Sequence, residues 1–402
     1  MSYIEKLLNG VSVEWLPLGE YADYQQPTRY LVESNNYSNN FKTPVLTAGK
    51  TFILGYTDET NGIYKASENP VIIFDDFTTA NKWVDFDFKA KSSAMKMITS
   101  IDESKALLKY IYYWMNTLPS GLVDGDHKRQ WISNYVNKLI PIPCPENPKK
   151  SIEIQQKIVA ILDSFTELTA ELTAELIARK TQYSYYREKL YTFDKNKVQH
   201  LQMDDESIGV LQRGKRFVKT DLISEGVPVI HYGEMYTHYG TWANKTKSFL
   251  SEELVKNKNL RVADKGDVVI VAAGETIEDI GMGTAWLGDE GVVVHDACFS
   301  YKTTLNPKFV AYFTRTKQFH DQIKKHISSG KISAINAKGL GKAIIPVPSK
   351  EEQDRVVAIL DKFDILTNSI SEGLPKEIKL RKKQYEYYRD LLLTFPQDNI
   401  VE

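Results

Sequence analysis

The sequence predicts an α+β protein of two mixed α/β domains separated by two long antiparallel coiled-coil helices, related by a pseudo-two-fold internal repeat. Three observations predict this class. Segments of the first half of the chain return in the same order in the second half. Each returning set ends in a long stretch with apolar residues three or four positions apart, the spacing of a helix. The chain has 402 residues, 42% of them hydrophobic, which is too long for one ordinary core.

The repeat has a period near 200 residues, which is too long for a solenoid unit and indicates a duplicated domain plus helix. Its three pairs of segments are 140–143 (IPIP) with 345–348 (IPVP), 159–165 (VAILDSF) with 357–363 (VAILDKF), and 182–187 (QYSYYR) with 384–389 (QYEYYR). The last two pairs differ in offset by four residues, 198 against 202. Four residues is close to one helical turn, so both copies can keep a similar helical register.

The repeat and the local composition predict the domain boundaries. Each copy has a dissimilar first part, expected to be globular, and a similar last part, expected to be helical. The predicted segments are a first domain 1–148, a central helix 149–193, a polar linker 194–206, a second domain 207–348, a C-terminal helix 349–395 and a tail 396–402.

The two helical stretches each carry an apolar seam. The seam of the first copy steps by three or four residues through Ile154, Ile158, Ile161, Phe165, Leu168 and Leu172. Ser349 and Glu352 make a capping box at the start of the second helix, and a break or kink is expected at Gly373-Leu374-Pro375. Two unrelated amphipathic helices on separate cores are an alternative. Two matched seams are more simply satisfied by an antiparallel pair.

Short apolar runs predict the interior of both domains. Buried strands are expected at 70–74, 268–272 and 291–294, and helices at 107–114 and 309–313. The two helices occupy similar places in their repeats, so both domains are expected to be mixed α/β.

Composition limits the function. The net charge is only −1, whereas a self-sufficient nucleic-acid binder is usually basic. Residues 207–348 carry 19 Lys and Arg against 14 Asp and Glu, and residues 15–150 carry 15 of each, so DNA affinity must come from local patches or a partner. Cys144 and Cys298 cannot form a disulfide framework or a zinc site. No membrane span or export signal is recognised, so a cytoplasmic protein is expected.

Motifs that carry catalysis are missing from the sequence. An adenine methyltransferase needs an Asn/Asp-Pro-Pro-aromatic loop, which Asn69-Pro70-Val71 and the other Asn-Pro pairs fail to match. No Gly-x-x-x-x-Gly-Lys-Ser/Thr phosphate loop is present. Asp75 and Asp76 are interpreted as hydrogen-bond acceptors at a strand end rather than as a metal site. The chain is therefore expected to be non-catalytic.

The order of these features resembles the type I restriction–modification specificity subunit, HsdS. A dissimilar globule, a Pro-Ile-Pro segment, an Ile-Val-x-Ile-Leu-Asp-x-Phe helix and a Tyr-Tyr-Arg end all occur twice or nearly so, and the resemblance covers essentially the whole chain. Segment 13–19 (VEWLPLG), however, has no counterpart at 208–216, so the second domain resembles a different subtype. A doubled tetrapeptide resembles the type IC branch in particular and comprises Thr169, Ala170, Glu171, Leu172, Thr173, Ala174, Glu175 and Leu176.

The resemblance implies a division of labour in which this chain is a non-catalytic subunit. Each globule would be a target-recognition domain that reads one half of a bipartite, asymmetric site in double-stranded DNA. The helices would hold the halves at a fixed spacing and dock two HsdM modification subunits, which bind S-adenosylmethionine and methylate adenine. Two HsdR subunits would add translocation and cleavage driven by ATP with Mg²⁺. No cofactor is expected on this chain itself.

Helix geometry suggests how the tetrapeptide could set the spacing. One Thr-Ala-Glu-Leu unit adds about 6 Å and a net turn of about 40°. One DNA base pair adds about 3.4 Å and roughly 35°. An added tetrapeptide would therefore keep one domain nearly in phase with a target one base pair longer. Two units are expected to set a spacer near the shorter end for this branch.

Basic and small polar segments supply the candidate DNA contacts, because reading DNA needs phosphate anchors and side chains for base edges. Each segment could instead be a solvated basic loop, and Trp83 is expected in the core rather than on DNA. The candidates in the first domain are Lys50, Thr78, Thr79, Lys82, Lys91, Ser92, Ser93, Lys96, His127, Lys128, Arg129 and Gln130. Those in the second domain are Arg213, Lys215, Arg216, Lys219, His231, Tyr232, Tyr236, Lys331 and Ser333.

Two other classes of function stay open at this point. A coiled-coil scaffold whose globules bind proteins would need no DNA contacts, and the basic loops together with the family pattern favour DNA specificity over it. A nuclease or methyltransferase fragment would need catalytic motifs, and their absence from the sequence opposes it.

Overall fold

The fold is described from a computed structural model of the chain. It covers residues 3–8, 10–49, 51–119 and 129–395. No helix in these ranges is long and apolar enough to cross a membrane.

The chain divides into two compact units. Unit 1 comprises residues 1–172 with 377–402, and unit 2 comprises residues 173–376. The division falls inside helix α4 (Pro148–Lys189), between its two Thr-Ala-Glu-Leu tetrapeptides, and again near the start of helix α11 (Gly373–Leu393). Each unit therefore holds one globule together with parts of the long helices.

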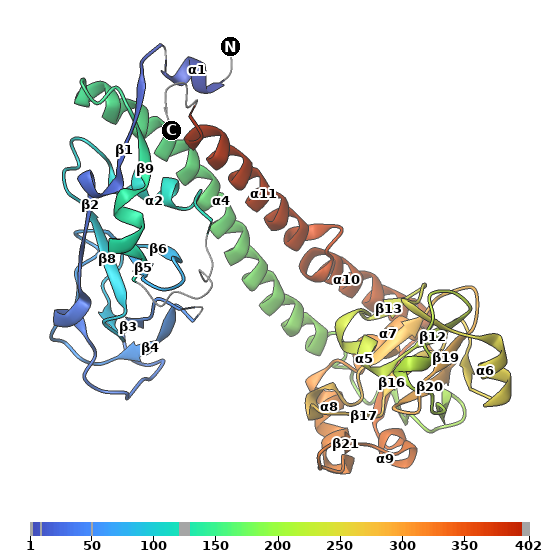
Figure 1. Cartoon of the computed structure of the whole chain (residues 1–402). Coiled ribbons are helices and arrows are strands. Elements are labelled where there is room, and N and C mark those ends of the chain that lie inside the picture. The colour runs from blue at the N-terminus through green and yellow to red at the C-terminus, as the bar shows by residue number, and fades with distance from the viewer. Residues whose placement is uncertain (1–2, 9, 50, 120–128, 396–402) are drawn as a thin grey trace. The chain divides into compact units, whose positions relative to one another are not determined.

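Unit 1 is built on two small sheets with short helices on their faces (Figure 1). One sheet has the order β2-β8-β5-β6 and is antiparallel throughout; the other has the order β4-β3-β7. Strands β1 and β9 form a separate antiparallel pair that contains the first Pro-Ile-Pro segment. The strands are β1 (Val13–Pro17), β2 (Ala22–Gln25), β3 (Thr43–Leu46), β4 (Ile53–Thr57), β5 (Val71–Asp75), β6 (Asn81–Val84), β7 (Lys89–Ala90), β8 (Met95–Ser100) and β9 (Leu139–Pro143). The helices of its globule are α1 (Tyr3–Leu8), α2 (Leu108–Met115) and α3 (Gln130–Ser133), with 3-10 turns at Leu18–Glu20, Pro27–Tyr30 and Tyr135–Asn137.

Unit 2 has the same plan with a different sheet. Its five-stranded sheet has the order β11-β20-β16-β18-β13, and a four-stranded sheet has the order β14-β12-β19-β15. The pair β10 with β22 contains the second Pro-Ile-Pro-like segment, and β17 pairs with β21. The strands are β10 (Gln199–Gln202), β11 (Gly209–Arg213), β12 (Val227–Ile230), β13 (Trp242–Ala243), β14 (Ser248–Leu250), β15 (Val262–Ala263), β16 (Val268–Val271), β17 (Ala273–Gly274), β18 (Gly283–Trp286), β19 (Val292–Val294), β20 (Cys298–Thr303), β21 (Ser333–Ala334) and β22 (Ile344–Val347).

The helices of unit 2 are short except at its C-terminal end. They are α5 (Tyr232–Thr237), α6 (Glu252–Asn257), α7 (Pro307–Phe313), α8 (Lys317–Ile323), α9 (Ala337–Gly341) and α10 (Lys350–Asn368), with 3-10 turns at Lys219–Asp221, Ile277–Asp279 and Lys324–His326.

The predicted interior elements are confirmed. The apolar runs become β5, β16 and β19, whose described side chains are almost all buried because both faces of each strand are covered. The two predicted helices become α2 and α7, which lie at equivalent places in the two units.

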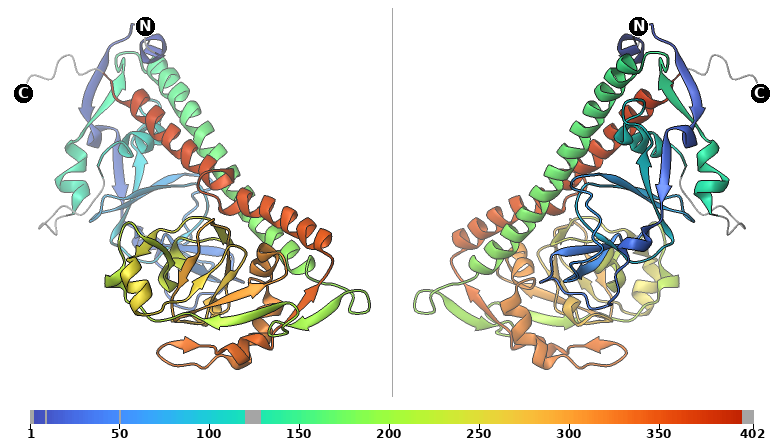
Figure 2. Two further views of the ribbon diagram at one scale, coloured as in Figure 1. Left: turned by 90° about the vertical axis from the view of Figure 1, so that its right-hand side faces the viewer. Right: turned by 90° about the vertical axis from the view of Figure 1, so that its left-hand side faces the viewer.

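Parts of the long helices pair antiparallel within each unit (Figures 1 and 2). In unit 1, Phe165 of α4 stacks on Tyr388 of α11 with ring centroids 5.2 Å apart and planes 16° apart. In unit 2, Tyr186 of α4 stacks on Phe363 of α10 at 5.6 Å and 23°. Phe165 corresponds to Phe363 in the repeat, and Tyr186 to Tyr388. The two aromatic pairs are therefore the same contact made twice. In one pair the phenylalanine comes from the first copy of the repeat and the tyrosine from the second, and in the other pair the copies are exchanged, as a pseudo-two-fold repeat requires.

The predicted seam needs one correction. Ile154 and Ile158 do not serve a helix–helix seam alone, because they are fully buried in the core of the first globule together with Leu162. Leu162 is not part of the predicted seam, yet it is also fully buried. The first turns of α4 thus act as a core helix of the globule, and helix pairing takes over further along the chain.

The second helix is broken, as predicted: α10 ends at Asn368 and α11 begins at Gly373. Ser349 caps α10, since its Oγ accepts a hydrogen bond from Glu352 N at 3.3 Å. Gly373 has φ +71°, and a Cβ there would lie 2.4 Å from Ile365 O. Only glycine adopts this left-handed backbone without strain so close to a carbonyl.

Each globule is joined to its helix by a buried glutamine whose amide oxygen accepts from the backbone N–H at the start of α2 or α7. In unit 1, Gln155 Oε1 accepts from Leu107 N at 2.9 Å and Gln155 Nε2 donates to Lys105 O at 3.0 Å. In unit 2, Gln353 Oε1 accepts from Asn306 N at 2.8 Å. Both glutamines are buried. A buried amide with satisfied donors and acceptors fixes the helix against the globule in one orientation.

Candidate nucleic-acid interface

The turn between β5 and β6 presents the first group of candidates. Asp75 Oδ1 accepts hydrogen bonds from Phe77 N at 2.9 Å and Thr78 N at 3.2 Å, which confirms its predicted role as an acceptor at the strand end. Thr78 is half-buried and Lys82 is exposed on β6, with its Nζ 5.4 Å from the ring centroid of Phe52. Lys82 is therefore accessible to a phosphate.

The segment after β7 presents a second group. Ser92 and Ser93 are exposed, whereas Lys91 is half-buried. Lys91 Nζ donates to Asn35 Oδ1 and lies 5.7 Å from the ring centroid of Tyr37. The lysine is thus held over an aromatic ring, and the serines beside it lie at the surface, with Ser92 Oγ accepting from Ala94 N at 3.1 Å.

Lys96 is a correction to the sequence prediction. Its side chain is fully buried on β8, with Nζ 3.6 Å from Asp76 Oδ2 and 4.4 Å from the ring centroid of Tyr24. Burial lowers the pKa of Lys96, and the charge of Asp76 opposes that shift. The other oxygen of Asp76 accepts from Trp131 N at 2.9 Å. Lys96 therefore holds the domain together and does not reach DNA.

Three further candidates are corrected for the same reason. Thr79 is buried in the β5–β6 turn with φ 61°, Gln130 is buried at the start of α3, and Ser333 is buried in β21. The backbone N–H of Gln130 donates to Asp76 O at 2.9 Å. These side chains lack the exposure that a groove contact needs.

Several candidates cannot be placed. Lys50, His127 and Lys128 lie outside the described residues, as does the side chain of Tyr236. Arg129, next to them in sequence, is exposed. Contact with DNA stays a prediction for these five, as it does for the exposed candidates.

The second domain brings its candidates together around four rings. His231 contacts Tyr232 with ring centroids 4.6 Å apart and His295 at 4.9 Å. Phe217 packs edge-on against His295 at 4.7 Å, and Tyr232 lies 5.1 Å from His295. We call Phe217, His231, Tyr232 and His295 the ring cluster. Tyr232 is 36% exposed, so the cluster offers an aromatic surface to a ligand.

A basic segment borders the ring cluster. Arg216 and Lys219 are exposed and Lys215 is half-buried. The backbone approaches β19 so closely that a Cβ on Gly214 would lie 2.2 Å from His295 O. Lys215 N also donates to Val294 O at 3.2 Å. The structure therefore joins sequence candidates near 215 and 231 into one surface.

Sequence reasoning missed two members of the ring cluster, Phe217 and His295. His295 Nε2 lies 3.1 Å from Phe217 O, and its Nδ1 lies 3.0 Å from Asp296 Oδ1. The signal that could have found it is the His-Asp pair directly after the apolar run of β19.

Burial keeps the histidines of the ring cluster neutral to lower pH. It lowers the pKa of His231, and the neighbouring His295 lowers it further, while Glu234 opposes the shift. Burial also lowers the pKa of His295, against the raising effect of Asp296. A neutral imidazole can donate and accept, which suits the half-buried His231 to base edges, whereas His295 is buried.

Two further candidates of the second domain, Arg213 and Lys331, are not members of the ring cluster. Arg213 is exposed, but its Nε donates to Asp296 O at 2.8 Å, so part of its guanidinium is used within the fold. Lys331 is exposed.

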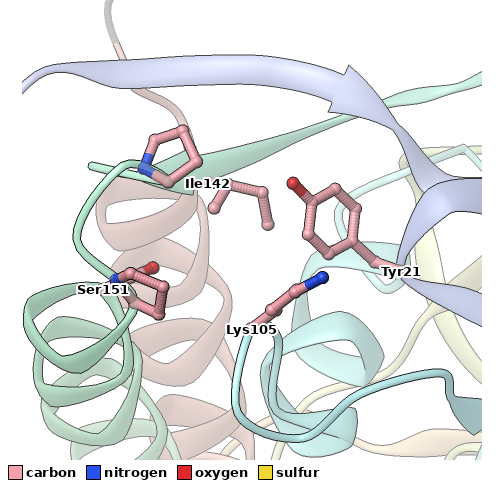
Figure 3. A pocket seen from close by; sticks show the side chains of 6 residues that line it. Tyr21, Lys105, Ile142 and Ser151 are labelled. Atoms are coloured by element: carbon pink, nitrogen blue, oxygen red, sulfur yellow. The ribbon is translucent and has the colours of Figure 1, made fainter.

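Two hollows are found among the described residues, one in each unit. Figure 3 shows Tyr21, Lys105, Ile142 and Ser151 around one of about 50 Å³ in unit 1, large enough for only a few atoms. A hollow of about 290 Å³ in unit 2 is lined by Arg187 and Arg315 among others. Arg315 Nη2 donates to Gly240 O at 2.9 Å, so this arginine serves the fold. Among the described side chains, no cluster of His, Cys, Asp and Glu could hold a metal ion.

The architecture defines a class of protein: a chain with an internal duplication, in which two unlike α/β domains are attached in the same way to long helices. Comparison with known proteins gives the family. Residues 206–380 match the type I restriction modification DNA specificity domain. The chain is 50% identical, over 417 aligned positions, to the Escherichia coli type I restriction enzyme EcoR124I/EcoR124II specificity subunit, covering 100% of this chain and 99% of that protein.

A second relative agrees. A putative type I restriction enzyme specificity subunit of Haemophilus influenzae is 30% identical, with 98% of each chain covered. The chain belongs to the family of type I restriction enzyme specificity subunits.

Solved structures have the same fold at low identity. The S subunit of a Mycoplasma genitalium type I restriction–modification system matches with TM-score 0.52 and 14% identity, covering 97% of this chain and 98% of that one. A chain from a study of complex assembly and conformational transition of the type I R-M system matches with TM-score 0.58 and 15% identity, covering 96% and 98%.

Proposed function

We propose that this specificity subunit reads a bipartite, asymmetric site in double-stranded DNA, one half with each globule. The observation that carries the proposal is the combination of like attachment and unlike sheets. Gln155 and Gln353 fix the two globules to their helices by the same contacts. The recognition sheets nevertheless differ in strand number and order. An asymmetric two-part target requires two domains that are attached to their helices in the same way but present different surfaces to the DNA.

In the second globule, the ring cluster and the basic segment at 215–219 form the proposed reading surface. Arg216 and Lys219 supply cations for phosphates, which position a protein on the duplex. His231 and Tyr232 supply ring and hydrogen-bonding groups for base edges. In the first globule, Lys82, Ser92 and Ser93 fill these roles.

The long helices carry a surface that occurs twice. Tyr185 is 58% exposed and Tyr387, its counterpart in the repeat, is 64% exposed. Each packs edge-on against the tyrosine that follows it, at 5.4 Å and 5.3 Å. Exposed aromatic side chains are typical of protein interfaces. A duplicated aromatic surface supports the docking of two copies of one partner, the HsdM modification subunit.

The remaining parts of the proposal follow from that assembly. S-adenosylmethionine is bound by the two HsdM subunits, and ATP with Mg²⁺ by two HsdR subunits, in a complex that works on DNA in the cytoplasm. This chain supplies the sequence preference and the spacing.

Methylome sequencing tests the proposal. The chain is co-expressed with a type IC HsdM in a methylation-free host, and the genome is sequenced for methyladenine. A single split, asymmetric motif is expected. No motif from a stable purified complex would contradict the proposal and favour a protein-binding scaffold.

A further inference from the structure

Two lysines, one in each unit, join an edge strand of the recognition sheet to the adjoining long helix. In unit 1, Lys109 Nζ lies 2.9 Å from Asp163 Oδ1 of α4 and 5.2 Å from the ring centroid of Trp83 on β6. In unit 2, Lys308 Nζ lies 2.8 Å from Asp361 Oδ2 of α10. We call each tryptophan–lysine–aspartate set a latch.

The second latch also contains a tryptophan. Lys308 Nζ lies 4.5 Å from the ring centroid of Trp242 on β13. Both β6 and β13 are the last strands of their sheets. A lysine placed over an indole is attracted by the negative face of the ring. Each lysine therefore contacts an edge strand through the tryptophan ring and a long helix through the aspartate carboxylate.

A tyrosine supports the carboxylate of each latch. Tyr113 Oη donates to Asp163, and Tyr312 Oη donates to Asp361 Oδ1 at 2.7 Å. Burial raises the pKa of both phenols, and the carboxylates raise it further, so both stay protonated donors. Two hydrogen-bonding partners hold each aspartate in one orientation towards its lysine.

The tryptophans are not products of the duplication. Lys109 and Asp163 are 54 residues apart and Lys308 and Asp361 are 53 apart, so these pairs belong to the repeat. Trp83, by contrast, precedes Lys109 by 26 residues, whereas Trp242 precedes Lys308 by 66.

The two sheets differ in strand order, yet each places a tryptophan next to the equivalent lysine. The two tryptophans come from positions that do not correspond in the repeat. A merely inherited packing contact would use equivalent positions, so the arrangement points to a constraint shared by both units. The strand of the first latch also carries a candidate DNA contact, since Lys82 directly precedes Trp83 on β6.

We propose that Lys109 and Lys308 are positioning residues for DNA recognition, each fixing the reading strand of its globule to the helix so that only targets with the correct spacer are accepted. This inference rests on the proposed function. Without a latch, the globule can rock about the remaining contacts of its helix. The half-sites stay the same, but the tolerance for spacer length widens.

The experiment measures spacer stringency with the whole complex. The chain, with Lys308→Met or Lys109→Met, is co-expressed with the HsdM subunit, and the host genome is the DNA probe. Methionine keeps the unbranched apolar stem of the side chain and removes the ammonium group, and with it both the charge and the contact with the aspartate. Methylation at sites with correct halves but a spacer one base pair longer or shorter is expected to rise roughly fivefold relative to correct sites.

Controls separate positioning from stability. Lys308→Arg keeps the cation over the indole and is expected to keep the stringency. Lys302→Met removes an exposed lysine whose partner Asp264 is 3.4 Å away, and Lys157→Met removes an exposed lysine of α4 paired with Glu153 at 2.7 Å. Both are expected to leave the stringency unchanged.

The outcomes are distinguishable. Equal loss of methylation at all sites, with an unchanged ratio, would mean a structural role only and overturn the inference. If Lys308→Met gives no stable complex, Trp242→Leu decides, because that indole is 39% exposed and its loss leaves the core intact. It is expected to relax the spacer, and unchanged stringency overturns the inference. Absence of any split motif with the unaltered chain would instead overturn the proposed function.

Discussion

Two lysines with similar neighbours in the sequence, Lys82 and Lys96, differ in burial and therefore in role. In the sequence, both Lys82 and Lys96 follow small and polar residues, and both are predicted to contact phosphates. Lys82 is exposed, whereas Lys96 is fully buried opposite Asp76. Desolvating a charge costs several kcal/mol unless a partner compensates, so Lys96 is committed to Asp76. Local composition does not reveal this, because the partner lies 20 residues away in the chain.

Lys96→Met is expected to lower the free energy of unfolding by about 3 kcal/mol, because Asp76 would be left buried and uncompensated. Urea unfolding of the purified complex or of the chain measures this. Lys82→Met is the matched control, with an expected change within about 0.5 kcal/mol. Equal destabilisation by the two variants would contradict the distinction between a structural and an accessible lysine.

The ring cluster makes the stability of unit 2 depend on pH. The folded-state pKa values of His231 and His295 are below the ordinary value of 6.5, so the unfolded chain binds more protons near and below that pH. Stability is therefore full above about pH 6.5 and is lost as the pH falls towards the folded-state pKa values. His231→Asn keeps an acceptor for Gly233 N, the bond His231 Nδ1 makes at 3.2 Å.

The variant His231→Asn is therefore expected to lose less thermal stability than the unaltered chain between about pH 7.5 and 5.5. Differential scanning calorimetry at the two pH values gives the comparison. The carboxylates shared by both chains cancel in the difference. Parallel pH slopes for the two chains would show that His231 does not titrate in this range.

At the scale of elements, the sequence predicted helices and strands well wherever the local pattern allowed only one structure. The all-apolar run of β5 and the break at Gly373 were both recognised, because burial on two faces and a left-handed glycine leave clear local signals. The role of Ile154 was wrong in part, since its spacing fits a helix seam and a core helix equally well. Trp83, expected in the core, does pack against it, but it is half-buried at a sheet edge beside Lys109, and that placement depends on long-range packing.

The break between α10 and α11 gives a test at this scale. Gly373→Ala is expected to destabilise the chain by roughly 1–2 kcal/mol, because a Cβ would meet Ile365 O in a left-handed backbone. Thermal unfolding measures it. Gly240→Ala is the control, since nothing lies within 4 Å of a Cβ at that position. A variant at Gly373 as stable as the control would mean that the helix runs on without the break.

At the scale of the whole molecule, duplication explains which features of the chain were accessible to sequence reasoning. The contacts that fasten a globule to its helix recur as Tyr113 with Asp163 and Tyr312 with Asp361, so the repeat revealed the frame. The reading surfaces were not duplicated, because each must match a different half of an asymmetric target. Residues of the ring cluster such as His295 therefore have no counterpart in the other copy of the repeat, so the repeat could not point to them.

The tetrapeptides lie where the two units meet along α4, so this part of the helix can change in length without altering either globule. The boundary between the units falls between Leu172 and Thr173, and Ala170, Glu171 and Ala174 are exposed. A third Thr-Ala-Glu-Leu unit after Leu176 adds about 6 Å with a net turn of about 40°. It is expected to give a target with the same halves and a spacer one base pair longer.

Methylome sequencing of the lengthened chain measures this spacer. Inserting only two alanines at the same place is the control, because it turns the following helix by about 200° and so takes one globule out of phase with the duplex. That variant is expected to lose methylation at every site, although each globule is unchanged. If the two-residue variant kept its motif, or if the added tetrapeptide left the spacer as it was, the helix would not be setting the distance between the half-sites. Their separation would then have to come from the partner subunits.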